Sequence, residues 1–259
     1  FSYFFSVFSV VKITESKSGE YIVTVTNFLI FGGMIVIYQK AVAVVGVGAI
    51  LPDAPDALTF WKNIQDGRYS ITDVPPDRWN PADYYDPDPR AIDKTYTKIG
   101  AWVRDFKFES LKWRLPIPPK VLAVMDETQQ WAIAASRAAL WDYGYPDRSL
   151  DTSRTAVILG NAMAGEKQIH TVLRIYLPEY LNVLEALPEF QELSPRLQAA
   201  LLGGLQSGIR ARIPVVTEDT MPGELSNIIA GPVANVVQPR GPNFVTDAAC
   251  ASSFAALQP

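Results

Sequence analysis

One residue, Cys250, combines a nucleophilic side chain with a position that could support covalent chemistry. It follows a short β-prone run, residues 243–246, and precedes a small-residue run compatible with a helix, residues 251–257. The first N–H groups of a helix lack intrahelical partners, and the positive end of its dipole favours a thiolate. Because a thiolate attacks acyl groups, the position predicts an acyl-accepting nucleophile. The alternative is a small, buried apolar cysteine, which is the commoner role of an unpaired cysteine.

Histidine and cysteine are scarce in the rest of the chain. The chain holds one histidine, His170, which lies far upstream in an expected helix, and we assign it no catalytic role. One cysteine and one histidine exclude a disulfide framework and argue against a His/Cys metal site. Gly46 and Gly48 suggest a dinucleotide loop, but Leu51 and Pro52 stand where its third glycine is needed. We therefore expect no metal and no directly bound cofactor.

The composition is that of a globular protein with a slightly acidic balance. Of 259 residues, 48% are hydrophobic and 11% aromatic, which is enough to bury a sizeable core. The net charge of −4, without a basic patch, argues against a nucleic-acid-binding surface. The single cysteine suits a reducing compartment, so we expect a cytoplasmic protein.

Apolar patterning predicts the first elements that would position the cysteine. Residues 41–47 form a continuous apolar run, typical of a central strand that is buried on both faces. Residues 56–65 place Leu58, Trp61 and Ile64 on one face of a helix.

The clearest helix covers residues 127–141. Asp126 can cap its start and Gly144 can end it. Helical spacing predicts a buried stripe made of Trp131, Ala134, Ala138 and Trp141.

The remaining segments alternate between strands and helices. Residues 68–98 hold five prolines and predict a long irregular segment. Strands are expected at 154–159 and 243–246, and helices at 164–186, with a break near Pro178, at 195–210 and at 222–237. This alternation favours an α/β fold with a mainly parallel sheet and helices on both faces.

The first 40 residues form an apolar N-terminal extension that we separate from a domain over residues 41–259. Residues 21–38 are an uncharged run of a length just sufficient to span a bilayer. Their β-branched content suits a strand pair instead, with Gly32 and Gly33 at the turn. A third interpretation is upstream or poorly ordered sequence that was never selected to fold. We favour this third interpretation and regard a membrane span as the weakest of the three.

Three separated motifs resemble those of β-ketoacyl synthase (ketosynthase) domains, most closely those of type I polyketide synthases and polyunsaturated fatty acid synthases. The first is GPNFVTDAACASS at residues 241–253. The second is AVAVVGVGA at 41–49, followed by Leu51-Pro52 and Phe60-Trp61. The third runs from Met125-Asp126 to the segment AALWDYG at 138–144. The motifs occur in the family's order over residues 41–259.

The resemblance implies a thiolase-like fold, of which this chain would supply the N-terminal half and stop just after the nucleophile. It implies that Cys250 is the catalytic nucleophile and that its backbone N–H is an oxyanion donor. The family reaction is a decarboxylative Claisen condensation of a cysteine-bound acyl chain with a malonyl-carrier thioester. In the family, two histidines and a lysine that assist this reaction follow the cysteine in sequence. We therefore expect the parent protein to be an acyltransferase and this chain alone to be inactive in condensation.

The resemblance also implies partners. Substrates would arrive on the phosphopantetheine of an acyl carrier protein, and the parent would be a homodimer. Two alternatives stay open: a thiolase-like acyltransferase that uses coenzyme A, and a non-catalytic scaffold of the chain-length-factor type. The motif around Cys250 favours the ketosynthase over both.

Two positions depart from the family pattern. Pro232 stands where an arginine is usual, and it removes an N–H from the expected helix at 222–237. Phe254 replaces a usual leucine, where it either narrows the acyl pocket or fills the core, and we favour the core. Half of a layered domain exposes faces that its other half would cover. We therefore expect Phe254 and Leu257 to be more exposed in this chain than in a longer parent.

Overall fold

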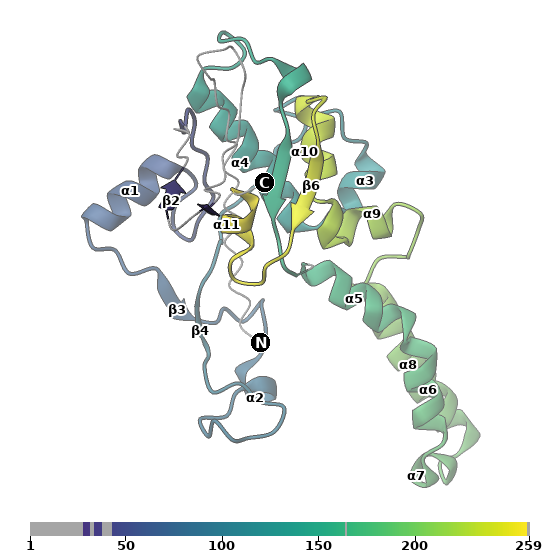
Figure 1. Cartoon of the computed structure of the whole chain (residues 1–259). Helices are drawn as coiled ribbons and strands as arrows, with labels where there is room; N and C mark the ends of the chain where they lie inside the picture. The colour runs from purple at the N-terminus through teal and green to yellow at the C-terminus, as the bar shows by residue number, and fades with distance from the viewer. Residues whose placement is uncertain (1–27, 32–33, 38–42, 164, 258–259) are drawn as a thin grey trace.

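The computed structural model describes residues 28–31, 34–37, 43–163 and 165–257 (Figure 1). Its strands are β1 (Phe28–Phe31), β2 (Met34–Ile37), β3 (Ile71–Asp73), β4 (Ile99–Ala101), β5 (Val157–Gly160) and β6 (Asn243–Thr246). Its α-helices are α1 (Ala57–Gln65), α2 (Pro81–Tyr84), α3 (Pro119–Val124), α4 (Glu127–Tyr143), α5 (Glu166–Ile175), α6 (Leu177–Glu185), α7 (Pro188–Gln191), α8 (Pro195–Arg212), α9 (Thr220–Glu224), α10 (Ala230–Val237) and α11 (Ser252–Ala256). Single 3₁₀ turns cover Thr152–Arg154 and Ser226–Ile228.

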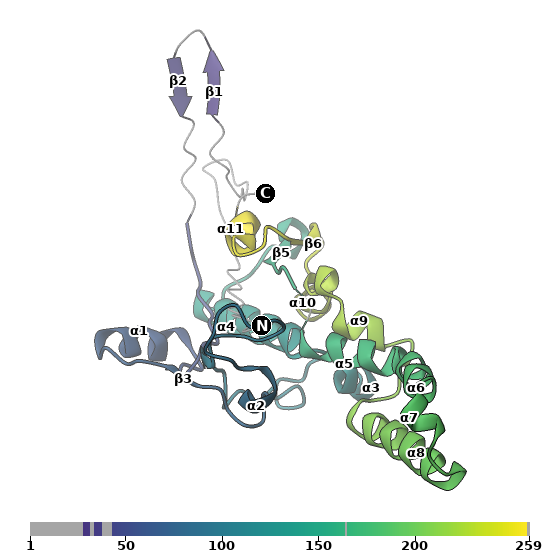
Figure 2. The ribbon, with the colours of Figure 1, turned by 90° about the horizontal axis from the view of Figure 1, so that it is seen from below.

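The parallel pair β5–β6 lies at the centre of the fold. Its register runs from Val157 opposite Asn243 to Gly160 opposite Thr246. Figures 1 and 2 show α10 and α4 on one face of the pair and α11 on the other. The strand expected at 243–246 is confirmed, whereas β5 begins at Val157 because the preceding residues form a 3₁₀ turn. Among the named strands β5–β6 is the parallel pair, since β1–β2 and β3–β4 are antiparallel.

The main hydrophobic core fills the space between α4, β5 and α10. It also includes the residue that precedes the N-cap of α4, Met125, and the residue that precedes α10, Ile229. Its buried members are Met125, Ala132, Ile133, Val157, Leu159, Ile229, Ala230 and Val233. The core therefore fixes the position of β5 and, through it, the position of β6 and the turn that follows.

Helix α4 confirms the predicted caps but buries a different face from the predicted one. The Asp126 carboxylate accepts from the Thr128 N–H at 2.9 Å, and Gly144 adopts the left-handed conformation with φ of 97°. Of the predicted stripe, Ala134 is buried, Trp131 and Ala138 are half-buried and Trp141 is 68% exposed, so the prediction is wrong for Trp141. The buried face consists mainly of small side chains, and its members are Thr128, Gln129, Ala132, Ile133, Ala134, Ala135, Ser136, Ala139 and Leu140. Small residues occupy this face because another segment of backbone lies directly against it.

That segment is residues 43–50, where the structure describes no strand. The expected buried strand at 41–47 is therefore not observed over its described part, and Val44 and Val47 are exposed. A strand needs a ladder partner, and instead the Val47 N–H donates to the Asp142 carboxylate at 2.8 Å. A Cβ on Gly48 would lie 2.0 Å from the Ala135 carbonyl oxygen, so this glycine permits close approach to α4.

Helix α1 packs loosely on the rest of the domain. The Asp56 side chain caps α1 by accepting from the Thr59 N–H at 2.7 Å, which confirms the helix expected at 56–65. None of its residues is buried, and Leu58 is 83% exposed. The segment 68–98 is mainly irregular, as expected, with the short elements β3 and α2 inside it.

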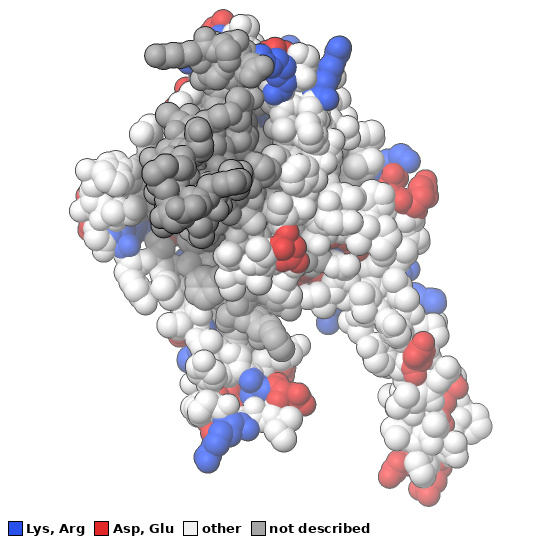
Figure 3. Space-filling model, viewed as in Figure 1, with Lys and Arg blue, Asp and Glu red and all other residues white. Residues whose placement is uncertain are grey.

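Helices α5 to α8 form an arm that projects from the core (Figures 1 and 2). The expected break near Pro178 is confirmed, because α5 ends at Ile175 and α6 begins at Leu177. No residue of α8 is buried, although the helix carries Leu197, Leu201 and Leu205 at intervals of four. Acidic side chains gather at the tip of the arm in Figure 3, where α6 and α7 contribute Glu185 and Glu189.

The helix expected at 222–237 is divided into α9, a 3₁₀ turn and α10. Leu225 interrupts it with extended backbone at φ of −69° and ψ of 131°. Pro232 consequently lies in the first turn of α10, where an N–H has no intrahelical acceptor to lose.

The N-terminal extension is described only over β1 and β2, which pair in antiparallel fashion with Phe31 opposite Met34. This arrangement matches the strand-pair interpretation rather than the one that the sequence favours, and the rest of residues 1–40 lies outside the described residues. None of the helices that the structure describes combines the length and hydropathy that crossing a bilayer requires.

Candidate active site

Cys250 lies in the turn that joins β6 to α11. The strand ends at Thr246, Ala251 is the N-cap of α11, and Cys250 directly precedes that cap. The predicted strand–turn–helix setting is therefore confirmed, although β6 is half-buried to exposed rather than buried. The cysteine is a free, exposed thiol, which excludes the alternative of a small buried apolar residue.

The turn holds one residue in an uncommon backbone conformation. Ala249 has φ of 50°, in the left-handed region that costs a non-glycine residue about 1–2 kcal/mol. Three hydrogen bonds maintain it: Ala249 N–H to the Asp247 carboxylate at 2.9 Å, Ala251 N–H to the Ala248 carbonyl at 3.0 Å, and Ser252 N–H to the Ala249 carbonyl at 3.1 Å. The backbone N–H of Cys250 is not among the donors of these bonds.

The Ser252 side chain adds a second set of restraints to the same turn. Its hydroxyl accepts from the Ala248 N–H at 3.0 Å and donates to the Ala249 carbonyl at 2.6 Å. The residue is 4% exposed, so these bonds are shielded from water. One hydroxyl therefore links the 247–248 peptide unit to the 249–250 peptide unit, which contains the Cys250 N–H.

The start of α11 is pressed against the end of β5. A Cβ on Gly160 would lie 2.3 Å from the Ser252 carbonyl carbon and oxygen and 2.5 Å from the Ser253 nitrogen. The Thr246 hydroxyl also lies 3.2 Å from the Ser252 carbonyl, to which it donates. These contacts attach the cysteine turn to the rigid β5–β6 pair.

Comparison with known proteins identifies the family. A model of the β-ketoacyl synthase N-terminal domain matches residues 39–259. The chain belongs to the β-ketoacyl synthase family. This result confirms the resemblance and the thiolase-like fold class expected from the three motifs.

Two curated relatives and one solved structure illustrate the match. A phenolphthiocerol/phthiocerol polyketide synthase of Mycobacterium tuberculosis is 30% identical over 221 residues, covering 84% of this chain and 12% of the relative. A polyunsaturated fatty acid synthase of Thraustochytrium sp. is 28% identical over 217 residues, covering 84% of this chain and 7% of the relative. The solved oxazolomycin ketosynthase domain OzmH KS7 of Streptomyces albus JA3453 has a TM-score of 0.57 and 26% identity, covering 82% of this chain and 30% of that chain. The chain thus spans a small part of the length of these relatives.

The histidine of this ketosynthase chain is not part of the cysteine turn. His170 is an exposed residue of α5 at the base of the arm, and α5 and α11 lie apart in both views (Figures 1 and 2). It lies near Glu224, whose pKa is raised mainly by burial and to which His170 makes the smallest contribution. The expectation that His170 has no catalytic role stays a prediction that this placement supports.

Phe254 points away from the core of the ketosynthase chain. It is 72% exposed, so the expectation that it fills the core does not hold for this chain. Helix α11 contacts β5 through the Ser252 side, where Gly160 provides room, and this leaves Phe254 outward. Leu257 is half-buried, and the expected greater exposure of both residues than in a longer parent stays a prediction.

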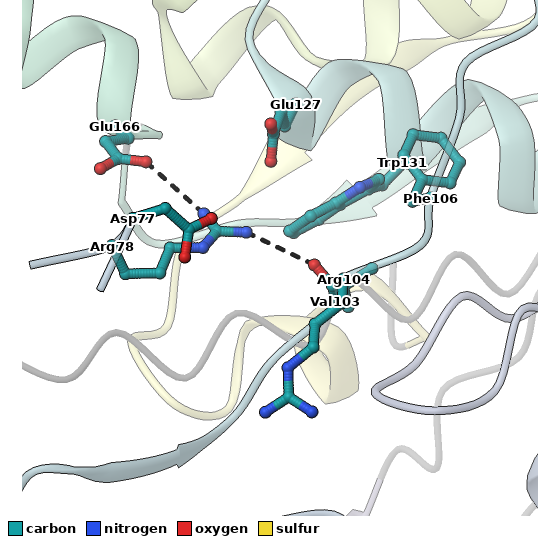
Figure 4. A pocket seen from close by; sticks show the side chains of 8 residues that line it. All are labelled: Asp77, Arg78, Val103, Arg104, Phe106, Glu127, Trp131 and Glu166. Carbon is teal, nitrogen blue, oxygen red and sulfur yellow. Dashed lines mark hydrogen bonds and ion pairs between the residues drawn. The ribbon is translucent and has the colours of Figure 1, made fainter. Parts of the chain in front are cut away.

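A separate cavity of about 350 Å³ lies beside α4 and the start of α5 (Figure 4). Arg78 enters it, with its guanidinium 3.6 Å from the Glu166 carboxylate and donating to the Val103 carbonyl at 3.4 Å. Its other lining residues are Asp77, Arg104, Phe106, Glu127 and Trp131. None of these lining residues belongs to the Cys250 turn.

Glu224 is a buried carboxyl that sequence reasoning did not find. It accepts from the Thr171 hydroxyl at 2.7 Å, while its second oxygen is buried and has no partner among the described residues. Burial raises the pKa of Glu224, and the nearby Asp126 charge raises it further, against the lowering effects of Thr171, Lys167 and His170. The group joins α9 to α5 at the base of the arm.

Sequence reasoning also missed the two residues that fix the turn, Ser252 and Gly160. Each carried a readable signal. Ser252 is a hydroxyl residue two positions after Cys250, and Gly160 directly follows the strand expected at 154–159. Without the pairing of β5 with β6, nothing in the sequence links the two positions.

Proposed function

We propose that this chain supplies the acyl-accepting part of a β-ketoacyl synthase, with Cys250 as nucleophile. The Cys250 thiolate attacks the carbonyl carbon of an acyl thioester, forming a carbon–sulfur bond and a tetrahedral oxyanion. The oxyanion collapses, the bond to the donor sulfur breaks, and the donor leaves as a thiol with a proton from solvent. The Cys250 backbone N–H stabilises the oxyanion.

One observation carries this proposal. The thiol is exposed at the head of α11, and the turn that holds it uses the N–H groups of its neighbours rather than that of Cys250. A nucleophile with an adjacent donor that the turn does not use is the minimum that acyl transfer from a thioester requires. Membership of the family supports the same assignment.

Condensation is the reaction that we propose for the parent protein. A malonyl-carrier thioester loses carbon dioxide, and the resulting carbanion attacks the carbonyl carbon of the acyl-cysteine. The Cys250 thiolate leaves, and the product is a β-ketoacyl thioester two carbons longer. In this chain the described residues bring no histidine to Cys250, so we propose that the chain alone undergoes acylation and does not condense.

We further propose that the acyl and malonyl groups arrive on the phosphopantetheine arm of an acyl carrier protein domain and that the parent acts as a homodimer. The names of the relatives, a polyketide synthase and a polyunsaturated fatty acid synthase, support carrier-bound substrates. A reactive free thiol suits the cytoplasm, which is the compartment that we propose. The acidic tip of the arm and the exposed leucine side chains of α8 are surfaces that could contact such partners.

Acylation measured by intact-protein mass spectrometry tests the proposal. The 259-residue chain is incubated with an acyl-carrier thioester, the matching acyl-coenzyme A, or neither. We expect the mass of one acyl group on the chain, faster from the carrier, and none on Cys250→Ala. A faster reaction with coenzyme A would favour the thiolase-like alternative. An unmodified chain, or equal modification of Cys250→Ala, would overturn the assignment of Cys250.

A further inference from the structure

We propose that Ser252 is a positioning residue for acyl transfer, whose hydroxyl aims the Cys250 N–H at the forming oxyanion. The inference rests on the proposed function, because it concerns the geometry of the same nucleophile. Ser252 does not touch the substrate. It acts through the peptide unit that joins Ala249 to Cys250.

The first step of the argument is the planarity of that peptide unit. The Ala249 carbonyl and the Cys250 N–H belong to one planar trans peptide, so they point in opposite directions. The Ser252 hydroxyl donates to the Ala249 carbonyl at 2.6 Å, and the Ser252 N–H donates to the same oxygen at 3.1 Å. Two donors that hold the carbonyl on the α11 side therefore direct the Cys250 N–H to the opposite side.

The second step is that the peptide unit needs such restraint. Ala249 has φ of 50°, which a non-glycine residue adopts only when its surroundings impose it. Rotation of the 249–250 peptide plane would move the Cys250 N–H away from the thiol's reacting face while leaving the thiol in place. The hydroxyl opposes that rotation directly, because it is bonded to the carbonyl of the rotating unit.

The third step is that water and neighbouring groups are poor substitutes for the hydroxyl. Ser252 is 4% exposed, and the same hydroxyl is the acceptor for the Ala248 N–H at 3.0 Å. Its single proton is consequently committed to the Ala249 carbonyl. Ser252 is itself held by Gly160 and by the Thr246 hydroxyl, so the restraint is anchored in the β5–β6 pair.

The test compares two reactions of one thiol. Acylation by an acyl N-acetylcysteamine thioester needs the oxyanion donor, whereas alkylation by iodoacetamide needs the thiol alone. In Ser252→Ala we expect acylation to slow by at least about tenfold, since losing an oxyanion donor outright costs about 100-fold or more. We expect alkylation to stay within about twofold. Ser253→Ala is the matched control, because Ser253 is adjacent and its hydroxyl makes no hydrogen bond with a described residue.

A conservative variant separates positioning from folding. Ser252→Thr keeps the hydroxyl, so its ratio of acylation to alkylation should return toward that of the original chain. An unchanged ratio in Ser252→Ala, or an equal loss in Ser253→Ala, would overturn the inference. A folded Ser252→Thr with the low ratio of the alanine variant would overturn it as well. Failure of the original chain to acylate would instead remove the proposed function, and the inference with it.

Discussion

Gly160→Ala tests how the sheet sets the position of the nucleophile. The added Cβ would lie 2.3 Å from the Ser252 carbonyl atoms. This is more than about 1 Å shorter than the roughly 3.5 Å at which non-bonded carbon atoms meet, and the opposing atoms are backbone. Helix α11 must therefore move away from β5. Overpacking of this kind costs about 1–3 kcal/mol.

The assay is urea unfolding followed by circular dichroism, combined with the acylation rate of Cys250. We expect the midpoint of Gly160→Ala to fall, at an unchanged slope, by an amount equivalent to about 1–3 kcal/mol. Acylation should slow at the same time, because the displaced α11 carries Ser252 with it. Gly204→Ala is the matched control, since a Cβ there meets nothing within 4 Å in helix α8. Alanine in an open helical position should stabilise by about 0.5–1 kcal/mol.

The reasoning would be refuted if Gly160→Ala kept both the original midpoint and the original acylation rate. That result would mean that α11 does not lie against β5 in solution. A loss of stability without a loss of acylation would keep the packing but separate it from the chemistry. A destabilised Gly204→Ala would show that alanine substitution itself, rather than the clash, is being measured.

Three further predictions concern the elements around this site. Glu224→Gln should become more stabilising, relative to the original chain, as pH rises from the carboxyl's ordinary pKa of 4.5. Because the pKa of Glu224 is raised in the folded state, its stabilising contribution is complete below the unfolded-state pKa and is lost as pH rises through the folded-state pKa. Urea midpoints of both proteins at about pH 5 and about pH 8 check this direction, and an equal difference in midpoint at the two pH values would contradict it. Asp126→Ala should cost about 1–2 kcal/mol by removing the N-cap of α4, with Asp126→Asn closer to the original in the same urea titration. Gly48→Ala should destabilise by about 1–3 kcal/mol, because its Cβ would lie 2.0 Å from the Ala135 carbonyl; a stabilised variant in thermal unfolding would show that residues 43–50 do not lie on α4.

The sequence-based predictions succeed where a local signal determines the local structure. Asp126 and Gly144 are recognisable as caps because capping depends on side-chain oxygen and on positive φ, which residue types reveal. The strand at 243–246 and the turn before α11 follow from a β-prone run next to small residues. Cys250 is identified for the same reason, since its neighbours on both sides define its setting.

Predictions fail where burial depends on which segment packs against which. Large size and helical spacing assign Trp141 to the buried face of α4, yet the face that packs is the alanine-rich one. Small side chains gain burial there because the backbone at Gly48 comes within contact of α4. The apolar run at 41–47 predicts a buried strand, but hydropathy alone does not supply the ladder partner that a strand requires.

The same distinction explains why the strand–turn–helix setting of Cys250 can be predicted and the residues that support it cannot. Cys250 is singled out by its chemistry, whereas Ser252 and Gly160 are ordinary residue types whose importance depends on a contact across the β5–β6 pair. The Ser252 hydroxyl restrains the 249–250 peptide plane. Because Gly160 lacks a side chain, the backbone of Ser252 can lie against β5. The hydrophobic core beneath β5 fixes the position of that strand. We therefore expect the rate of acyl transfer to Cys250 to depend on the turn, on Gly160 and on the core beneath β5. Substitutions at any of the three should change acyl transfer before they change the accessibility of the sulfur.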